Sequence, residues 1–207
     1  FVGDAELWLV PRPADGIVVV GSGKTQLHGI SIEDGAERWT YEGEALDKNG
    51  GSVADGTAYV GSRNGRLIAL DVSDGTERWT FGTDKAVRGH PAVHGGRVFA
   101  GTTGKRVHAL STESGSEHWR WDQPSGSPIT PLFASWPATM GLGQTAYVAH
   151  AGRLFALDAR DGSEEWRAKT DLTSMELQRS GDTIYVSGGG LSQASGDASA
   201  TSYGAVG

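Results

Sequence analysis

Several side chains in this sequence have the chemical types that catalysis or ligand binding requires. Glu164 and Glu165 are adjacent carboxylates, His90 and His94 are four residues apart, and Gly21–Thr25 reads GSGKT. Paired carboxylates can perform acid–base catalysis, histidines bind zinc, and a glycine-rich turn that ends in Lys-Thr can hold phosphate. Each possibility depends on the structural element that carries the residues.

The local patterns favour structural roles for these residues. Successive residues of a strand point to opposite faces, so Glu164 and Glu165 would not act on the same side. His90 and His94 lie on a strand-like segment rather than a helix, and two ligands leave a zinc site incomplete. GSGKT lacks the upstream glycine of a phosphate-binding loop, because Val18 stands there, and strand-like residues follow it. The motif is therefore interpreted as a turn between two strands.

The composition excludes several classes of function. The 207 residues carry a net charge of −7 and no basic cluster longer than two residues, which argues against a nucleic-acid partner. No cysteine is present, so there is no thiolate nucleophile and no cysteine metal ligand. No apolar stretch approaches the ~20 residues of a membrane-spanning helix, and the first residues lack the pattern of a signal peptide.

One string recurs along the chain. Residues 69–81 read ALDVSDGTERWTF, and related strings stand at 29–41, 109–121 and 156–168. With Trp8 of the opening ELW taken in the same register, the motif tryptophans are 31, 40, 40 and 47 residues apart. A period of about 40 residues indicates stacked supersecondary units. Glu164 recurs as Glu37, Glu77 and Glu117, so it is interpreted as a turn or edge residue.

Each period has the pattern of a small antiparallel sheet. Strand-like segments at 57–60, 66–71 and 76–81 follow Asp-Gly or Asn-Gly pairs, which are typical of tight hairpin turns. With 51–54 as an inner strand, the unit has four antiparallel strands. Both faces of the segment 67–70 are apolar, so neighbouring sheets must cover both sides. The sequence therefore predicts an all-β fold, a β-propeller built of four-stranded blades.

The repeats resemble the pyrroloquinoline-quinone-like (PQQ-like) β-propeller repeat family. The runs YVGSRNGRLIALDVSDGTERWTF at 59–81 and YVAHAGRLFALDARDGSEEWRA at 147–168 carry the resemblance. In that family the motif is a tryptophan-docking element, in which the Trp of one blade packs against the neighbouring blade beside the small residue. The resemblance implies such roles for Trp39, Trp79, Trp119 and Trp166, for the small residues Gly29, Ala69, Ala109 and Ala156, and for the turn glycines Gly35, Gly75, Gly115 and Gly162.

The chain is expected to form one partial propeller domain over residues 1–207, with about four to five blades. The blade repeats are placed at about 9–41, 42–81, 82–121, 122–168 and an incomplete 169–207. Complete rings of the family commonly have eight blades, so the chain is interpreted as a fragment of such a ring, cut within blades at both ends. Open blade faces and strand edges would favour self-association.

Two intervals depart from the regular period. About nine residues are missing between Trp8 and Trp39, where the inner strand of the first blade should lie, which argues against a complete first blade. Residues 125–143 are an insertion that is expected to form a long loop between blades. Its apolar residues Leu132, Phe133 and Trp136 would either contact a protein partner or cover a blade face of the same chain.

The residues near the end of the chain carry two further expectations. The tail at 188–204 is low in apolar content and is expected to be a flexible insertion, whereas Tyr203–Val206 could begin another strand of the repeat.

His28 and His108 occupy the strand position that Ile68 fills in another repeat. They are therefore expected to fill semi-apolar sites between blades.

The resemblance favours a non-catalytic scaffold that binds or assembles proteins, in a periplasmic, cell-envelope or extracellular location. It implies no catalytic or metal-binding residue and no cofactor. One alternative is a fragment of a quinoprotein dehydrogenase, which would hold PQQ and calcium on the propeller axis, although no carboxylate and amide group matches its calcium ligands and no cysteine pair is present. A second alternative is a ligand-sensing propeller domain of a larger signalling protein.

Overall fold

The computed structural model describes residues 7–8, 13–23, 25–124, 138–142, 144–150, 153–169, 176–180, 183–187 and 204–206. Every regular element within these ranges is a β-strand, as the hairpin signals and the apolar runs between them predict. No helix in the described part of the chain has the length and apolar character that a membrane crossing requires.

The strands form five antiparallel sheets. The first contains β1 (Leu7–Trp8), β2 (Pro13–Ala14), β3 (Ile17–Ser22), β4 (Gln26–Ser31) and β5 (Glu37–Glu42). The second contains β6 (Leu46–Ala54), β7 (Thr57–Ser62), β8 (Arg66–Asp71) and β9 (Glu77–Gly82). The third contains β10 (Ala92–His94), β11 (Arg97–Thr102), β12 (Arg106–Ser111) and β13 (Glu117–Asp122). The fourth contains β14 (Ala138–Leu142), β15 (Thr145–His150), β16 (Arg153–Asp158) and β17 (Glu164–Lys169), and the fifth contains β18 (Glu176–Ser180), β19 (Thr183–Ser187) and β20 (Gly204–Val206).

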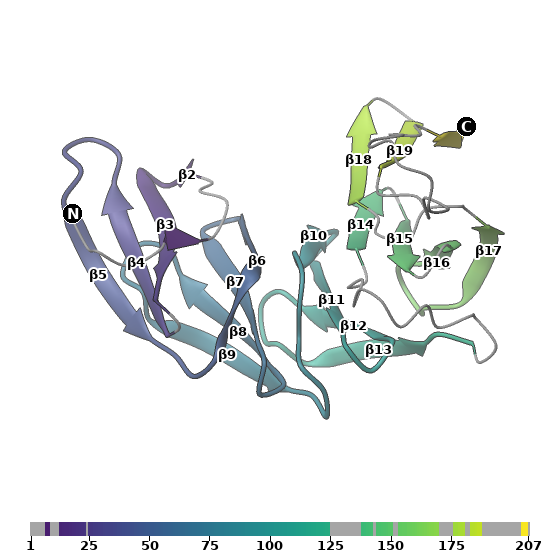
Figure 1. Cartoon of the computed structure of the whole chain (residues 1–207), viewed down its shortest axis with the longest axis horizontal. Helices are drawn as coiled ribbons and strands as arrows, with labels where there is room; N and C mark the ends of the chain where they lie inside the picture. Colours follow the sequence, from purple (N-terminus) through teal and green to yellow (C-terminus); the bar gives the residue numbers. More distant parts are fainter. Residues whose placement is uncertain are drawn as a thin grey trace, which may run out of the picture.

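The sheets follow one another around an arc, from β3–β5 at one end to β18–β20 at the other (Figure 1). The first strand of each sheet lies on the inside of the arc, where β6, β10, β14 and β18 approach one another, and β5, β9, β13 and β17 lie on the outside. Consecutive strands pair within each sheet, which is the arrangement of a propeller blade. The predicted all-β propeller fold is confirmed.

The first sheet corrects the prediction about Trp8. In β1, Leu7 pairs with Ser22 and Trp8 pairs with Gly21. Leu7 therefore holds the position that Leu46 holds opposite Ser62 in the second sheet. β1 and β2 both pair with β3, so together they form an interrupted inner strand. Trp8 is therefore an inner-strand residue, not a motif tryptophan. The interval of 31 residues arose from this wrong register, and the first sheet has an inner strand after all.

The insertion also differs from the prediction at its end. Residues 138–142 were expected to belong to a long loop, but they form β14 and pair with β15 from Thr139 opposite Val148 to Leu142 opposite Thr145. Leu132, Phe133 and Trp136 lie outside the described residues. Most of the tail at 188–204 lies outside them too, and the strand expected near Tyr203 is confirmed as β20, where Ala205 pairs with Tyr185.

The apolar cores lie between successive sheets. On β8, Leu67 and Ala69 pack into a cluster with residues of the third sheet, whereas Ile68 and Leu70 pack into a cluster with residues of the first. All four side chains are buried. A third cluster joins the third and fourth sheets. The prediction that neighbouring sheets cover both faces of this strand is confirmed, and it explains why the strand lacks polar alternation.

The tight turns have the backbone conformation that their residues predict. Asp55 and Gly56 both have positive φ, at 47° and 67°, which matches the two central residues of a type I′ hairpin turn. Asp15 and Gly16 repeat this geometry between β2 and β3. The GSGKT segment begins with the last two residues of β3, Gly21 and Ser22, and β4 begins directly after it at Gln26, so its interpretation as a turn between two strands is confirmed.

Candidate functional site

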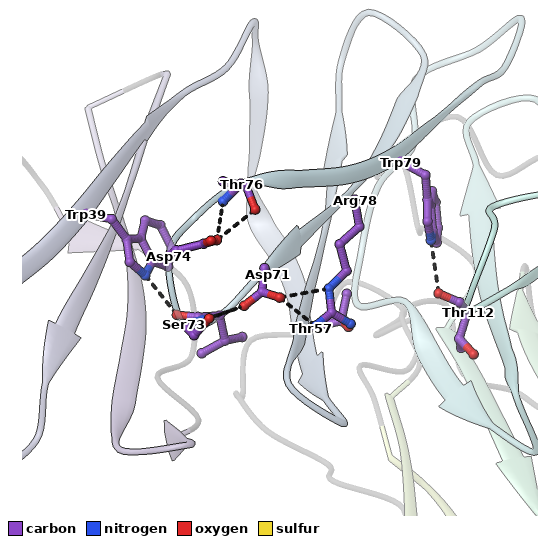
Figure 2. Close-up of polar contacts among 10 residues, drawn as sticks. Trp39, Thr57, Asp71, Ser73, Asp74, Thr76, Arg78, Trp79 and Thr112 are labelled. Carbon is purple, nitrogen blue, oxygen red and sulfur yellow. Dashed lines mark hydrogen bonds and ion pairs between the residues drawn. The ribbon is translucent and has the colours of Figure 1, made fainter.

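The motif tryptophans connect neighbouring sheets. The indole N–H of Trp39 donates to the carbonyl oxygen of Val72 in the next sheet at 2.8 Å, and Trp79 donates to Thr112 at 2.9 Å (Figure 2). Trp119 makes the same bond to Ala159 at 3.0 Å. These three tryptophans are 8–9% exposed. A buried indole needs a partner for its N–H, and here the next blade supplies it.

The turn glycines form the other side of each contact. A Cβ atom on Gly75 would lie 2.6 Å from the ring of Trp39, and Gly115 and Gly162 are equally close to Trp79 and Trp119. All three glycines have φ between +69° and +76°. Glycine is therefore required for two reasons at these positions, because the backbone is left-handed and the indole lies against the Cα atom.

The small residues of the motif lie on the same sheet as their tryptophan. Gly29 pairs with Trp39 across β4 and β5, and Ala69 pairs with Trp79 across β8 and β9. Ala109 and Ala156 pair with Trp119 and Trp166 in the same way. Each pair stands next to a shift in register between the two strands.

Trp166 occupies the same strand position but is 37% exposed. Its ring lies 5.9 Å from that of Tyr147 on its own sheet. In the first sheet, Gly35 has nothing within 4 Å of where its Cβ would lie, and Ile32 is 61% exposed. The three complete docking contacts among the described residues therefore join the first four sheets to one another.

The acidic residues of the motif hold the turns. Asp74 Oδ1 accepts bonds from the backbone N–H and the hydroxyl of Thr76 at 2.9 and 2.7 Å, and Asp71 accepts bonds from Ser73 and Arg78 (Figure 2). The bonds from Ser73 and the guanidinium of Arg78 lower the pKa of Asp71 to about 2. Arg160 does the same for Asp158, whose pKa is also about 2. These carboxylates stabilise the turns, which is the structural role that their repetition in the sequence indicates.

The recurring glutamates begin the outer strands. Glu37, Glu77, Glu117 and Glu164 are the first residues of β5, β9, β13 and β17. This position agrees with their interpretation as turn or edge residues.

Two of these glutamates contact buried histidines. His28 Nδ1 lies 3.0 Å from Glu37 and its Nε2 lies 2.7 Å from Ser22 Oγ. His108 Nδ1 lies 2.6 Å from Glu117, and its ring lies 5.4 Å from that of Phe81 in the preceding sheet. The expected place of His108 between two blades is confirmed. Ser22, His28 and Glu37 are linked in the order of a proton relay. Ser22 and His28 are both buried, so the Ser22 hydroxyl is not presented to a substrate at the surface.

A set of polar residues on the inside of the arc has no repeat elsewhere in the described residues, and sequence reasoning missed it. This inner polar cluster consists of Asp47, Arg88, Gly89 and His90. Asp47 is fully buried, its Oδ2 accepts the N–H of Gly89 at 3.1 Å, and its Oδ1 lies 4.0 Å from Nε of Arg88. His90 Nδ1 lies 3.0 Å from the carbonyl oxygen of Gly51 on β6. The cluster joins the inner edges of the second and third sheets.

A register signal could have found the cluster. Leu46 pairs with Ser62 and Val87 with Thr102, so the residues that follow, Asp47 and Arg88, hold equivalent positions in adjacent blades. Asp47 is fully buried, and a buried charge needs a partner. Aligning the repeats on their inner strands would have placed the carboxylate beside the guanidinium.

The metal hypothesis receives no support from the described residues. Among them, no group of three or more His, Cys, Asp or Glu side chains could hold a metal ion. His90 bonds to a backbone carbonyl, as described above.

The stacked four-stranded sheets and their tryptophan contacts define the class of this protein as a β-propeller of PQQ-like repeats. The chain belongs to the family whose model is described as outer membrane protein assembly factor BamB, which matches residues 43–189. No curated protein sequence matches the chain significantly.

Solved structures with similar folds include BamB, a designed protein and an alcohol dehydrogenase. The chain is similar to BamB from Moraxella catarrhalis, with a TM-score of 0.71 and 20% identity over 86% of this chain and 57% of that one. The computationally designed Ika8 protein gives 0.69 and 17% over 85% and 54%. Quinohemoprotein alcohol dehydrogenase from Comamonas testosteroni gives 0.63 and 20% over 89% and 40%. The chain thus spans little more than half of the BamB structure, and these likenesses show the fold.

Proposed function

We propose that this protein is a protein-binding or assembly scaffold of the cell envelope. The observation that carries the proposal is the family match over residues 43–189, whose model describes an outer membrane protein assembly factor. This range covers the second, third and fourth sheets. A scaffold requires a rigid surface more than a catalytic centre, and stacked blades that are joined by buried tryptophans supply one.

The residues that repeat in every blade already have structural roles. The motif tryptophans and glycines join sheets, and the motif aspartates hold turns. Residues that occur once are therefore the better candidates for partner contact. In the inner polar cluster, His90 is exposed while its ring is held against Gly51, and Arg88 is part-buried beside Asp47. A polar or acidic segment of a partner fits this edge.

The test is complementation in cells that lack the protein. We expect the deletion to reduce the amounts of correctly assembled envelope proteins, measured by quantitative mass spectrometry of the envelope fraction, and the wild-type protein to restore them. His90→Ala should restore them less well than His118→Ala, a matched control because His118 is also exposed but lies on the outer strand β13. Full restoration by both variants would remove the inner edge from the proposal.

Titration with a cofactor separates the scaffold from the dehydrogenase alternative. PQQ with calcium is added to the purified protein, and the melting temperature and bound quinone absorbance are measured. Any ligand that binds only the native state raises the melting temperature. A scaffold that does not bind PQQ should therefore show no change. A rise in melting temperature together with bound quinone would replace the scaffold proposal by the enzyme one.

A further inference from the structure

Lys105 holds a backbone conformation that favours glycine. It lies in the turn between β11 and β12 with φ +63°, and the neighbouring blade has Gly65 in this place with φ +84°. The two positions are equivalent because each residue donates its N–H to the carbonyl three residues before it, of Thr102 and Ser62 respectively. A Cβ atom makes this conformation unfavourable, and within the described residues the Lys105 side chain has no ion pair or hydrogen bond that would offset the cost. Backbone strain without a local gain points to a functional role for the side chain.

A second lysine lies against the same turn. Lys85 belongs to the connector between β9 and β10, and a Cβ atom on Gly104 would stand 2.8 Å from its Cγ, so the aliphatic stem of Lys85 runs over Gly104. The N–H of Thr103 donates to the carbonyl oxygen of Ala86 at 2.9 Å, which fixes the connector to the turn. The Lys85 side chain is exposed and has no ion pair among the described residues. Two cationic side chains, Lys85 and Lys105, are thereby placed next to Gly104.

Arg106 keeps the carboxylates of these segments away from the two lysines. Its guanidinium donates to Asp84 at 3.2 Å and to Asp122 at 2.7 Å. Asp84 directly precedes Lys85, so without Arg106 it would be available to that lysine. The unpaired charges at this place are therefore positive, although the whole chain carries a net charge of −7.

We propose that Lys85 and Lys105 bind an acidic, extended segment of a protein partner. The inference rests on the proposed scaffold function and names the chemistry of the partner. Two ammonium groups without a carboxylate of their own chain attract carboxylates of another chain, and each ammonium group can donate several hydrogen bonds. The cost of holding Lys105 in a left-handed conformation is then offset in the complex.

The position of Lys85 argues for a polypeptide rather than a small anion. The connector that carries it continues to His90 of the inner polar cluster. Its backbone is fixed on both sides, because Val87 donates its N–H to the second sheet at 2.9 Å and Arg88 donates to the third at 3.2 Å. The six residues from Lys85 to His90 can span up to about 20 Å. An extended segment reaches both the lysines and the inner polar cluster, whereas a small anion contacts one part of this path.

The proposal is tested by fluorescence anisotropy with a labelled peptide of about ten residues that alternates Glu and Ser. We expect the wild-type chain to bind it more weakly as salt is raised. Lys85→Gln and Lys105→Gly should each weaken binding about 3-fold, and together about 10-fold. Arg120→Gln is the matched control, because Arg120 is an exposed cation on the outer strand β13 that has no ion pair among the described residues. A peptide that alternates Lys and Ser should not bind.

The stability of Lys105→Gly separates binding from folding. Relief of the left-handed strain should raise the melting temperature by about 2–4 °C while binding is lost. A lower melting temperature, no binding of the acidic peptide, or an equal loss for Arg120→Gln would overturn the proposal. Vesicles of phosphatidylglycerol that bind through both lysines, while the peptide does not, would also overturn it and assign the lysines to a membrane surface.

Complementation in cells separates the failure of this inference from that of the scaffold function. We expect the Lys85→Gln and Lys105→Gly double variant to restore the assembled envelope proteins less well than Arg120→Gln does. Full restoration by the double variant, with wild-type restoration intact, would overturn the lysine site and leave the scaffold function standing. Failure of the wild-type protein to restore them would overturn both.

Discussion

Gly75 and Trp39 lie in different sheets, yet a single Cβ atom added to Gly75 would stand 2.6 Å from the indole ring. The same relationship joins Gly115 to Trp79 and Gly162 to Trp119. The turn of one blade is therefore shaped by the side chain of its neighbour. This explains why the glycine and the tryptophan recur together in the sequence.

Replacing Gly75 by alanine should cost much more than replacing Gly35. Both glycines are left-handed, with φ of +74° and +69°, so each alanine bears the same backbone cost of about 1 kcal/mol. Only Gly75 faces an indole, and the overlap should add about 1–3 kcal/mol. Urea unfolding of the two variants measures the difference. Equal losses would show that the backbone angle alone selects glycine here.

Truncation of the motif tryptophans should reveal which contacts are complete. Trp79→Ala removes a buried ring and a bond to Thr112, so we expect a loss of about 3–5 kcal/mol in the free energy of unfolding. Trp166→Ala should cost less than about half as much, because its ring is 37% exposed. Denaturant unfolding of the two variants and the wild type checks this. A Trp166 loss as large as that of Trp79 would mean that the fifth sheet already buries it.

The pair of Asp47 and Arg88 should respond asymmetrically to substitution. Arg88→Met leaves a fully buried carboxylate without its cation and should cost about 3 kcal/mol. Asp47→Asn leaves a guanidinium that is part-exposed, and its amide oxygen can still accept the N–H of Gly89, so we expect about 1 kcal/mol. Thermal unfolding of both variants and the double variant measures the coupling. A smaller loss for Arg88→Met than for Asp47→Asn would contradict the assignment.

The turn aspartates predict a loss of stability in acid. The pKa of Asp71 is lowered from 3.8 to about 2 by its bonds from Ser73 and Arg78. Between these values the folded chain binds fewer protons than the unfolded chain, so the stabilisation is complete above pH 4 and is lost as pH falls to about 2.

A series of melting temperatures against pH measures this effect. Asp71→Asn should melt below the wild type at neutral pH, and the two curves should converge as pH approaches 2. Parallel curves over the whole range would show that the carboxylate charge of Asp71 contributes nothing to stability.

The sequence alone determined the repeating part of this protein. Periodic tryptophans, Asp-Gly turns and apolar runs specify stacked antiparallel blades, because hairpin geometry and two-sided burial are local requirements that each repeat must meet. Glu164 and Asp74 could be recognised as architectural for the same reason. The register of the first blade was misread, because the Glu-x-Trp triplet at Trp8 resembles the motif but lacks the glycine that stands four residues before the tryptophan in the other copies.

Only the tertiary structure decided the features that depend on contacts between blades. Asp47 and Arg88 come together because two inner strands lie side by side, and no spacing within one repeat encodes that approach. The unequal exposure of Trp166 and Trp79 likewise arises from their neighbours rather than from their own strands, which carry the same motif. Local sequence specifies a blade, whereas burial between blades depends on which surfaces meet.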